Sequence, residues 1–169
     1  MPVWLTWMFG IAAVSAESAL LAAGGFTSFS LQLGLVLAVL LGLRRDFIPG
    51  ALTLALLLPV IEWYAGGPKG YYGLGLVVVF VLLQLVRGWL RGEWGLLHFL
   101  FGGAAAVVHP LLVAGAMTFS SPSSPIAAAV LSSLPASLAG MLVALWPAQW
   151  LLRRADAAFE GRMRNSLFD

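Results

Sequence analysis

The sequence predicts an all-α integral membrane protein, a bundle of six transmembrane helices, and three observations support this prediction. Of the 169 residues, 61% are hydrophobic and only 9% are charged, whereas a soluble domain carries about 25% charged residues. The apolar residues fall into six runs, most of them near the length of about 20 residues that a helix needs to cross a bilayer. The chain contains no cysteine, which excludes disulfides and thiolate metal sites.

Each expected span ends at residues that break a helix or carry charge. The spans are 3–23, 29–43, 47–64, 71–86, 94–119 and 126–152, of which the second is short. Residues 1–152 therefore form one membrane domain, and 153–169 form a polar cytoplasmic tail, either an interfacial helix or a solvated segment. The start of the chain lacks the basic region of a cleavable signal peptide, so we expect the first span to belong to the mature protein.

The arginines set the expected orientation of the bundle. With six spans, one side of the membrane carries Arg44, Arg45, Arg87, Arg91, Arg153, Arg154, Arg162 and Arg164. The other side carries only Lys69. Because basic residues in short loops mark the cytoplasmic face, we expect both termini to be cytoplasmic. The first six arginines would then anchor the bundle there, and the loops at 62–69 and 120–125 would face outward.

The stretch 59–73 joins two apolar runs and carries a carboxylate near its base. Gly66-Gly67-Pro68 ends the helix, because Gly costs about 1 kcal/mol and Pro about 3 kcal/mol in a helix interior. The aromatic residues on both sides of this turn favour the membrane surface. Two interpretations of Glu62 remain: it marks the water boundary, or it faces other helices and makes a polar contact there.

Glu17 lies midway along the first expected span, where a charge costs about 3 kcal/mol or more. Its helical neighbours are apolar and offer it no partner. Glu17 is therefore either a functional or partner-contacting group, or a neutral carboxyl with a structural hydrogen bond. Gln32 and Gln84 are the other polar groups at this depth, and we expect them to hold helices together.

The two histidines, His98 and His109, share one face of the fifth span but lie about 16 Å apart along it. They cannot bind the same metal ion, and no third ligand has suitable spacing, so no metal or cofactor is expected. We expect His98 to be interfacial and His109 to lie deeper, as a candidate ligand or proton-relay group. The chain has no phosphate loop, Gly-x-Ser-x-Gly elbow or paired-histidine motif, which argues against an enzyme.

Two spans carry stripes of small residues, which let membrane helices approach closely. These residues are Ala12, Ser15, Ala19 and Ala22 in the first span, and Gly102, Gly103, Ala105 and Ala106 in the fifth. We interpret both stripes first as packing surfaces within the bundle. The alternative is that the first stripe binds a partner.

Together these features resemble the MreD family, small rod-shape-determining membrane proteins of bacterial cell elongation. The length and the six-span plan with both ends inside fit this family. Its third span ends in an acidic residue with a Gly eight residues later, a spacing that Glu62 and Gly70 keep. Leu145-Trp146-Pro147 followed by an arginine pair is also similar. The chain departs from the family in having Glu rather than Asp at 62, and leucines rather than glycines at 54 and 58.

The resemblance implies a non-enzymatic scaffold in the bacterial cytoplasmic (inner) membrane. Such proteins bind the bitopic coiled-coil protein MreC and link MreB filaments to wall synthases. Glu62, Gly70, Glu17, His109 and the first-span stripe are then candidate partner or structural contacts. Membrane lipid is the other expected partner, and nucleic acid is not expected.

The architecture is also similar to the substrate-binding subunits of energy-coupling-factor vitamin transporters, and this is the alternative function. Those subunits dock through an Ala-x-x-x-Ala stripe in the first helix, which Ala12 with Ala16 and Ala19 with Ala23 match. A vitamin would then contact polar groups of the outward loops.

Overall fold

The computed structural model describes residues 3–24, 32–65, 70–87, 95–120 and 125–165, and within these ranges it is entirely helical apart from short turns. The helices are α1 (Val3–Gly24), α2 (Leu33–Arg44), α3 (Phe47–Ala65), α4 (Tyr71–Arg87), α5 (Gly95–Ser120), α6 (Pro125–Ser132) and α7 (Leu134–Asn165). Stretches of α3, α5 and α7 are long and apolar enough to cross a membrane: Phe47–Tyr64, His98–Ser120 and Leu134–Ala158. The apolar stretches of α1, α2 and α4 are shorter. Within the described ranges, the prediction of an all-α chain is confirmed, and three of its helices are long and apolar enough to span a membrane.

The short helix α2 lies at the centre of the bundle and contacts α1, α3, α4, α5 and α7. Every residue from 34 to 43 is buried, as expected of a helix that is apolar on all sides. Its 12 residues rise only about 18 Å, less than the roughly 30 Å of a bilayer core. The first turn of α2 therefore begins inside the protein, where its backbone N–H groups need partners.

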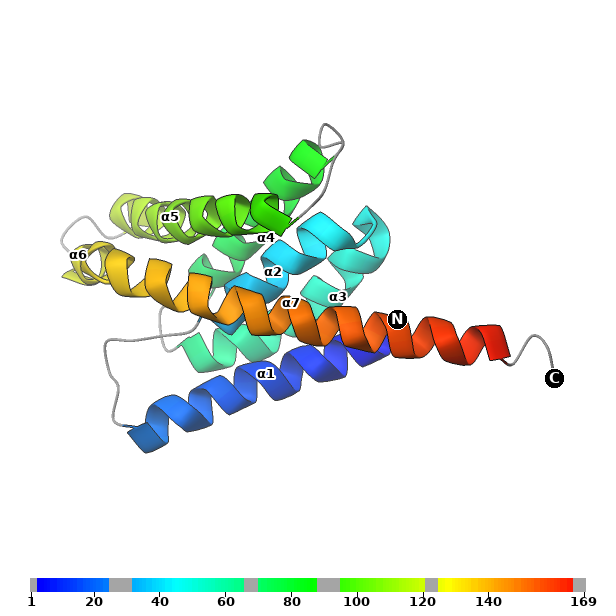
Figure 1. Cartoon of the computed structure of the whole chain (residues 1–169). Helices are drawn as coiled ribbons and strands as arrows, with labels where there is room; N and C mark the ends of the chain where they lie inside the picture. Colours follow the sequence, from blue (N-terminus) through cyan, green and yellow to red (C-terminus); the bar gives the residue numbers. More distant parts are fainter. Residues whose placement is uncertain (1–2, 25–31, 66–69, 88–94, 121–124, 166–169) are drawn as a thin grey trace.

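The outer helices pack in neighbouring pairs around this centre, α1 on α3 and α5 on α7 (Figure 1). The first residues of α1 and the last residues of α7 lie toward the same side of the bundle. The final turns of α7 run beyond the other helices. The polar stretch from residue 153 is thus a continuation of α7 as far as Asn165.

The small-residue stripe of α1 does not pack inside the bundle, so that expectation was wrong. Ala12 and Ala19 are exposed and Ser15 is half-buried, while the side chain of Ala22 lies outside the described residues. The buried face of α1 is instead formed by Thr6, Gly10, Val14 and Glu17. The physical reason is the cost of exposing polar groups to lipid: α1 turns its carboxylate inward, whereas alanines tolerate an apolar exterior.

The α5 stripe behaves as expected, because Gly102, Ala105 and Ala106 are buried. Gly102 lies against α7, where an added Cβ would come within 2.6 Å of Leu145 Cδ1. Gly103 is the exception, since a Cβ there would meet nothing within 4 Å.

The expected sixth span is divided into α6 and α7 by a turn at Ser133. Pro135 follows at once, and proline both lacks an N–H and clashes with the carbonyl four residues earlier. Helices α3, α5 and α7 nonetheless continue through Pro59, Pro110 and Pro147. Among the described residues, the break beside Pro135 thus differs from the three prolines that lie inside continuous helices.

Candidate functional site

Glu62 in the last turns of α3 binds the start of α4. Its Oε2 accepts a hydrogen bond from the backbone N–H of Gly70 at 2.9 Å. Its Oε1 accepts one from the N–H of Gly73. The first N–H groups of a helix lack partners within the helix, and the helix dipole favours a negative group there. The structure therefore agrees with the interpretation in which Glu62 makes a polar contact between helices.

Two glycines make this contact possible. Gly70 has a φ of +97°, a conformation that glycine adopts at little cost, and it directs its N–H back toward α3. At Gly73 a Cβ would lie 2.7 Å from Glu62 Oε1 and 3.1 Å from Leu58 Cδ2. The eight residues from Glu62 to Gly70 are thus enough for the chain to turn and to bring the start of α4 back to the Glu62 carboxylate.

Glu17 makes the equivalent contact between α1 and α2. Its Oε1 accepts the N–H of Gln32 at 2.7 Å, and its Oε2 accepts the N–H of Leu33 at 2.8 Å. Glu17 is only 8% exposed, and both hydrogen bonds are partly buried. The structural interpretation of Glu17 is the one that the geometry supports.

Gln32 links this contact to α7. Its backbone lies in the left-handed region, with φ of 50°, and it donates from Nε2 to Ser137 Oγ at 2.7 Å. Gln84 at the other end of the bundle donates from Nε2 to the carbonyl of Arg45 at 2.8 Å. Both glutamines therefore join separate elements, as the sequence predicts.

His109 lies buried between α5 and α4. Its Nε2 is 3.2 Å from the carbonyl oxygen of Tyr72, and its ring meets the Tyr72 ring edge-on with centroids 4.5 Å apart. A Cβ at Gly75 would lie 2.8 Å from His109 Cδ2, so this glycine makes room for the imidazole. His98, expected to be interfacial, is also buried, at 2% exposed. Among the described residues no group of three or more potential ligands could hold a metal.

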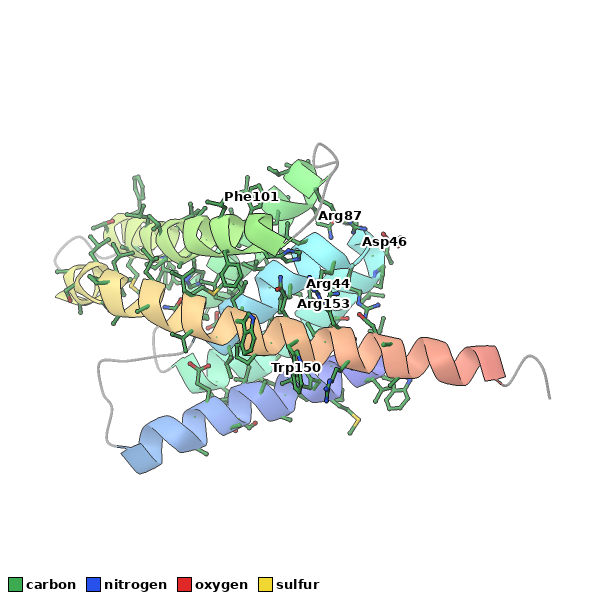
Figure 2. The ribbon with its side chains drawn as sticks, in the orientation of Figure 1. Arg44, Asp46, Arg87, Phe101, Trp150 and Arg153 are labelled. Atoms are coloured by element: carbon green, nitrogen blue, oxygen red, sulfur yellow. The ribbon has the colours of Figure 1, made fainter. Side chains whose placement is uncertain are left out.

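The arginines gather at the opposite end of the bundle from Glu62, and we call this region the arginine end. Its described members are Arg44, Arg45, Asp46, Arg87, Arg153, Arg154 and Asp156. Figure 2 shows Arg44, Asp46, Arg87 and Arg153 gathered there, from α2, the following turn, α4 and α7. The sequence placed these arginines on one side, and in the structure they share one end. Arg91 and Lys69 lie outside the described residues.

Ion pairs and carbonyl contacts tie this end together. Arg45 pairs with Asp156 of α7 at 2.8 Å, and Arg87 pairs with Asp46 at 3.1 Å. Arg87 also donates to the carbonyl of Arg45. Arg154 stacks over the Trp150 ring, 4.2 Å from its centroid. The turn after α2 is thereby held by both α4 and α7.

Sequence reasoning missed Ser137 and the part played by Tyr72. Ser137 lies in an Ala/Leu-rich stretch, and a single hydroxyl there gives no signal of its own. The sequence predicts Tyr72 as an aromatic residue of the turn and a candidate polar contact for a vitamin, whereas in the structure its carbonyl and ring hold His109. Both contacts depend on how distant helices pack.

The chain matches no family model, no curated protein and no solved structure.

Proposed function

We propose that this protein is a non-enzymatic scaffold of the bacterial cytoplasmic membrane, of the MreD type, that binds a bitopic partner such as MreC and links it to the cell-elongation machinery. The observation that carries the proposal is the contact between Glu62 and Gly70. The spacing on which the resemblance rests corresponds to a hydrogen bond that fixes α3 and α4 at their shared turn. If the similarity to the family were one of composition alone, Glu62 and Gly70 would not need to contact each other, so the hydrogen bond between them supports the proposal.

The hydrogen bonds that the interior polar side chains make between helices also support a scaffold. Glu17, Glu62 and Gln84 each bind backbone groups of another helix or turn, and Gln32 binds the Ser137 hydroxyl of α7. Contacts of this kind make a bundle rigid, and a rigid surface binds a partner at a lower entropic cost. We assign six membrane crossings to this bundle, with the arginine end in the cytoplasm, because basic residues mark that side.

The outer face of α1 is the surface that we propose for the partner. Helix α1 contacts only α2 and α3 among the described helices. Its remaining face carries Trp4 and Met8 followed by Ala12, Ala16 and Ala19, all exposed. Small residues permit backbone contact with a second membrane helix, and a bitopic protein brings one such helix.

The same exposed alanines favour the second candidate function, a substrate-binding subunit of an energy-coupling-factor vitamin transporter. In that function Ala12 and Ala16 would dock on the coupling subunit, and the end near Glu62 would bind the vitamin. The two functions differ in whether the isolated protein binds a small molecule.

The experiment is an affinity purification from bacterial membranes in mild detergent, combined with a vitamin titration of the purified protein. We expect a bitopic cell-elongation protein to be recovered with the chain. We expect no saturable change in tryptophan fluorescence at vitamin concentrations near 1 μM, which corresponds to about 8 kcal/mol of binding free energy. Saturable vitamin binding together with recovery of an ATPase pair would establish the transport function instead.

A further inference from the structure

Among the side chains that the structure describes, the arginine end carries more positive charge than its acids neutralise. Five arginines and two aspartates are described there, and each aspartate already pairs with an arginine, Asp156 with Arg45 and Asp46 with Arg87. Arg154 lies on the Trp150 ring. Among the described residues, Arg44 makes neither an ion pair nor a contact with an aromatic ring. Its Nη1 is buried and has no hydrogen-bond partner within the part of the chain that the structure describes.

The surroundings of Arg44 attract an anion. The charged groups that act on it most strongly are Asp156, Arg153 and Arg45, two of which are positive. The only acid among them is already bonded to Arg45 at 2.8 Å. A half-buried guanidinium without a matching acceptor is costly, and an added anion would remove that cost by accepting its donors.

A crevice beside Arg44 has room for one oxygen atom of such an anion. It is lined by Thr6 of α1, by Leu37, Leu40 and Leu41 of α2, by Arg44 and Arg45, and by Leu152 and Asp156 of α7. The crevice is about large enough for one water molecule. One oxygen of a tetrahedral anion fits this space, while the remaining oxygens would lie at its mouth.

We propose that the crevice at Arg44 binds a phosphate group, supplied by the headgroup of an anionic phospholipid. Guanidinium groups match phosphate oxygens with paired hydrogen bonds, and basic pockets between membrane helices hold anionic headgroups. Trp150 supports a lipid as the source, because it is half-exposed beside Arg154 and tryptophan concentrates at the headgroup level. The acyl chains would then run along the exposed apolar faces of α1 and α7. Free phosphate offers the same chemistry from solution.

The test compares wild type with Arg44→Gln in nanodiscs of neutral phosphatidylcholine, with and without one-fifth phosphatidylglycerol. We expect the anionic lipid to raise the unfolding temperature of wild type and to leave that of Arg44→Gln nearly unchanged. The apparent affinity for phosphatidylglycerol in neutral detergent should fall roughly ten- to hundredfold, as expected for the loss of charge-assisted hydrogen bonds. Arg154→Gln removes the same charge from the same end and should retain most of the lipid effect.

Two further measurements identify the source of the phosphate group and keep the test decisive if Arg44→Gln does not fold. If inorganic phosphate alone stabilises wild type through Arg44, and the lipid adds nothing, the phosphate comes from solution. Arg44→Lys keeps the charge without the paired donors, so it should bind lipid with intermediate affinity even if Arg44→Gln does not fold. Equal lipid effects in wild type and Arg44→Gln, or equal losses in Arg44→Gln and Arg154→Gln, would overturn the proposal. None of these outcomes depends on the scaffold function.

Discussion

Glu17 Oε2 lies 2.8 Å from the backbone nitrogen of Leu33, so a carboxylate in the middle of α1 closes the start of the buried helix α2. Glu62 of α3 accepts the N–H of Gly70 in the same way, just before α4 begins. In both cases an acidic side chain of one helix replaces water at the first N–H groups of the next described helix. This arrangement lets α2 begin inside the bundle.

The first prediction concerns Glu17. Glu17→Leu should strongly lower the thermal stability of the purified protein, because the partly buried N–H groups of Gln32 and Leu33 lose their acceptors, at a cost of up to about 1–3 kcal/mol each. Glu17→Gln should lose less, since its amide keeps one oxygen for one of the two donors. Thermal unfolding in mild detergent measures both, with Ala55→Leu on the exposed face of α3 as the control. Equal stability of Glu17→Leu and the control would refute the capping role.

The second prediction concerns the turn between α3 and α4. Glu62→Gln should be better tolerated than Glu62→Leu, because only Gln can still accept from Gly70 or Gly73. Gly73→Ala should also be destabilising, since its Cβ would lie 2.7 Å from the carboxylate of Glu62. The readouts are thermal stability and partner recovery. If Leu and Gln at position 62 both behave like wild type, Glu62 is only a boundary residue.

The third prediction compares two helical glycines. Gly75→Ala should cost about 1–3 kcal/mol of stability through overpacking, because its Cβ would meet the His109 ring at 2.8 Å. Gly103→Ala should be neutral or stabilising by up to about 1 kcal/mol, since alanine favours a helix and the site is open. Chemical or thermal unfolding of the two variants side by side is the measurement. A Gly75→Ala protein as stable as Gly103→Ala would show that the His109 contact is loose.

The sequence was sufficient to predict the elements whose signals are local. Apolar runs between charged or Gly/Pro-rich breaks located the helices. The arginines were correctly grouped because they follow every second expected span, and every second span ends on the same side of the bundle. The eight-residue interval from Glu62 to Gly70 was predicted only as a spacing shared with the family, and the hydrogen bond between the two residues is a finding of the structure.

The features that the sequence predicted wrongly or did not predict depend on the packing of distant segments. The alanines of α1 looked like a packing stripe, yet the position of Glu17 decides which face turns inward. The short expected span 29–43 gave no sign of its position, and the structure places its helix, Leu33–Arg44, at the centre of the bundle, where five neighbouring helices cover it. The burial of His98 at 2% exposed was not predicted either, because it also depends on neighbouring helices. No local pattern carries this information.

The fourth prediction concerns orientation in the membrane. A cysteine in place of Ser123 should react with an impermeant thiol reagent added to intact cells, whereas a cysteine in place of Arg91 should react only after lysis. The chain has no native cysteine, so the labelling is unambiguous. The reverse pattern would contradict the proposed orientation, and labelling of both from outside would contradict the six-span count.

The central claim is that this protein binds a membrane partner through the exposed face of α1, and the most direct measurement is partner recovery with Ala19→Leu. Ala19 is exposed, so we expect Ala19→Leu to unfold at the same temperature as wild type and to lose the bitopic cell-elongation protein from the mild-detergent purification. Ala104→Leu, on the exposed face of α5, should retain it. Full recovery of that partner with Ala19→Leu, or its absence from the wild-type purification while a vitamin binds saturably, would contradict the account.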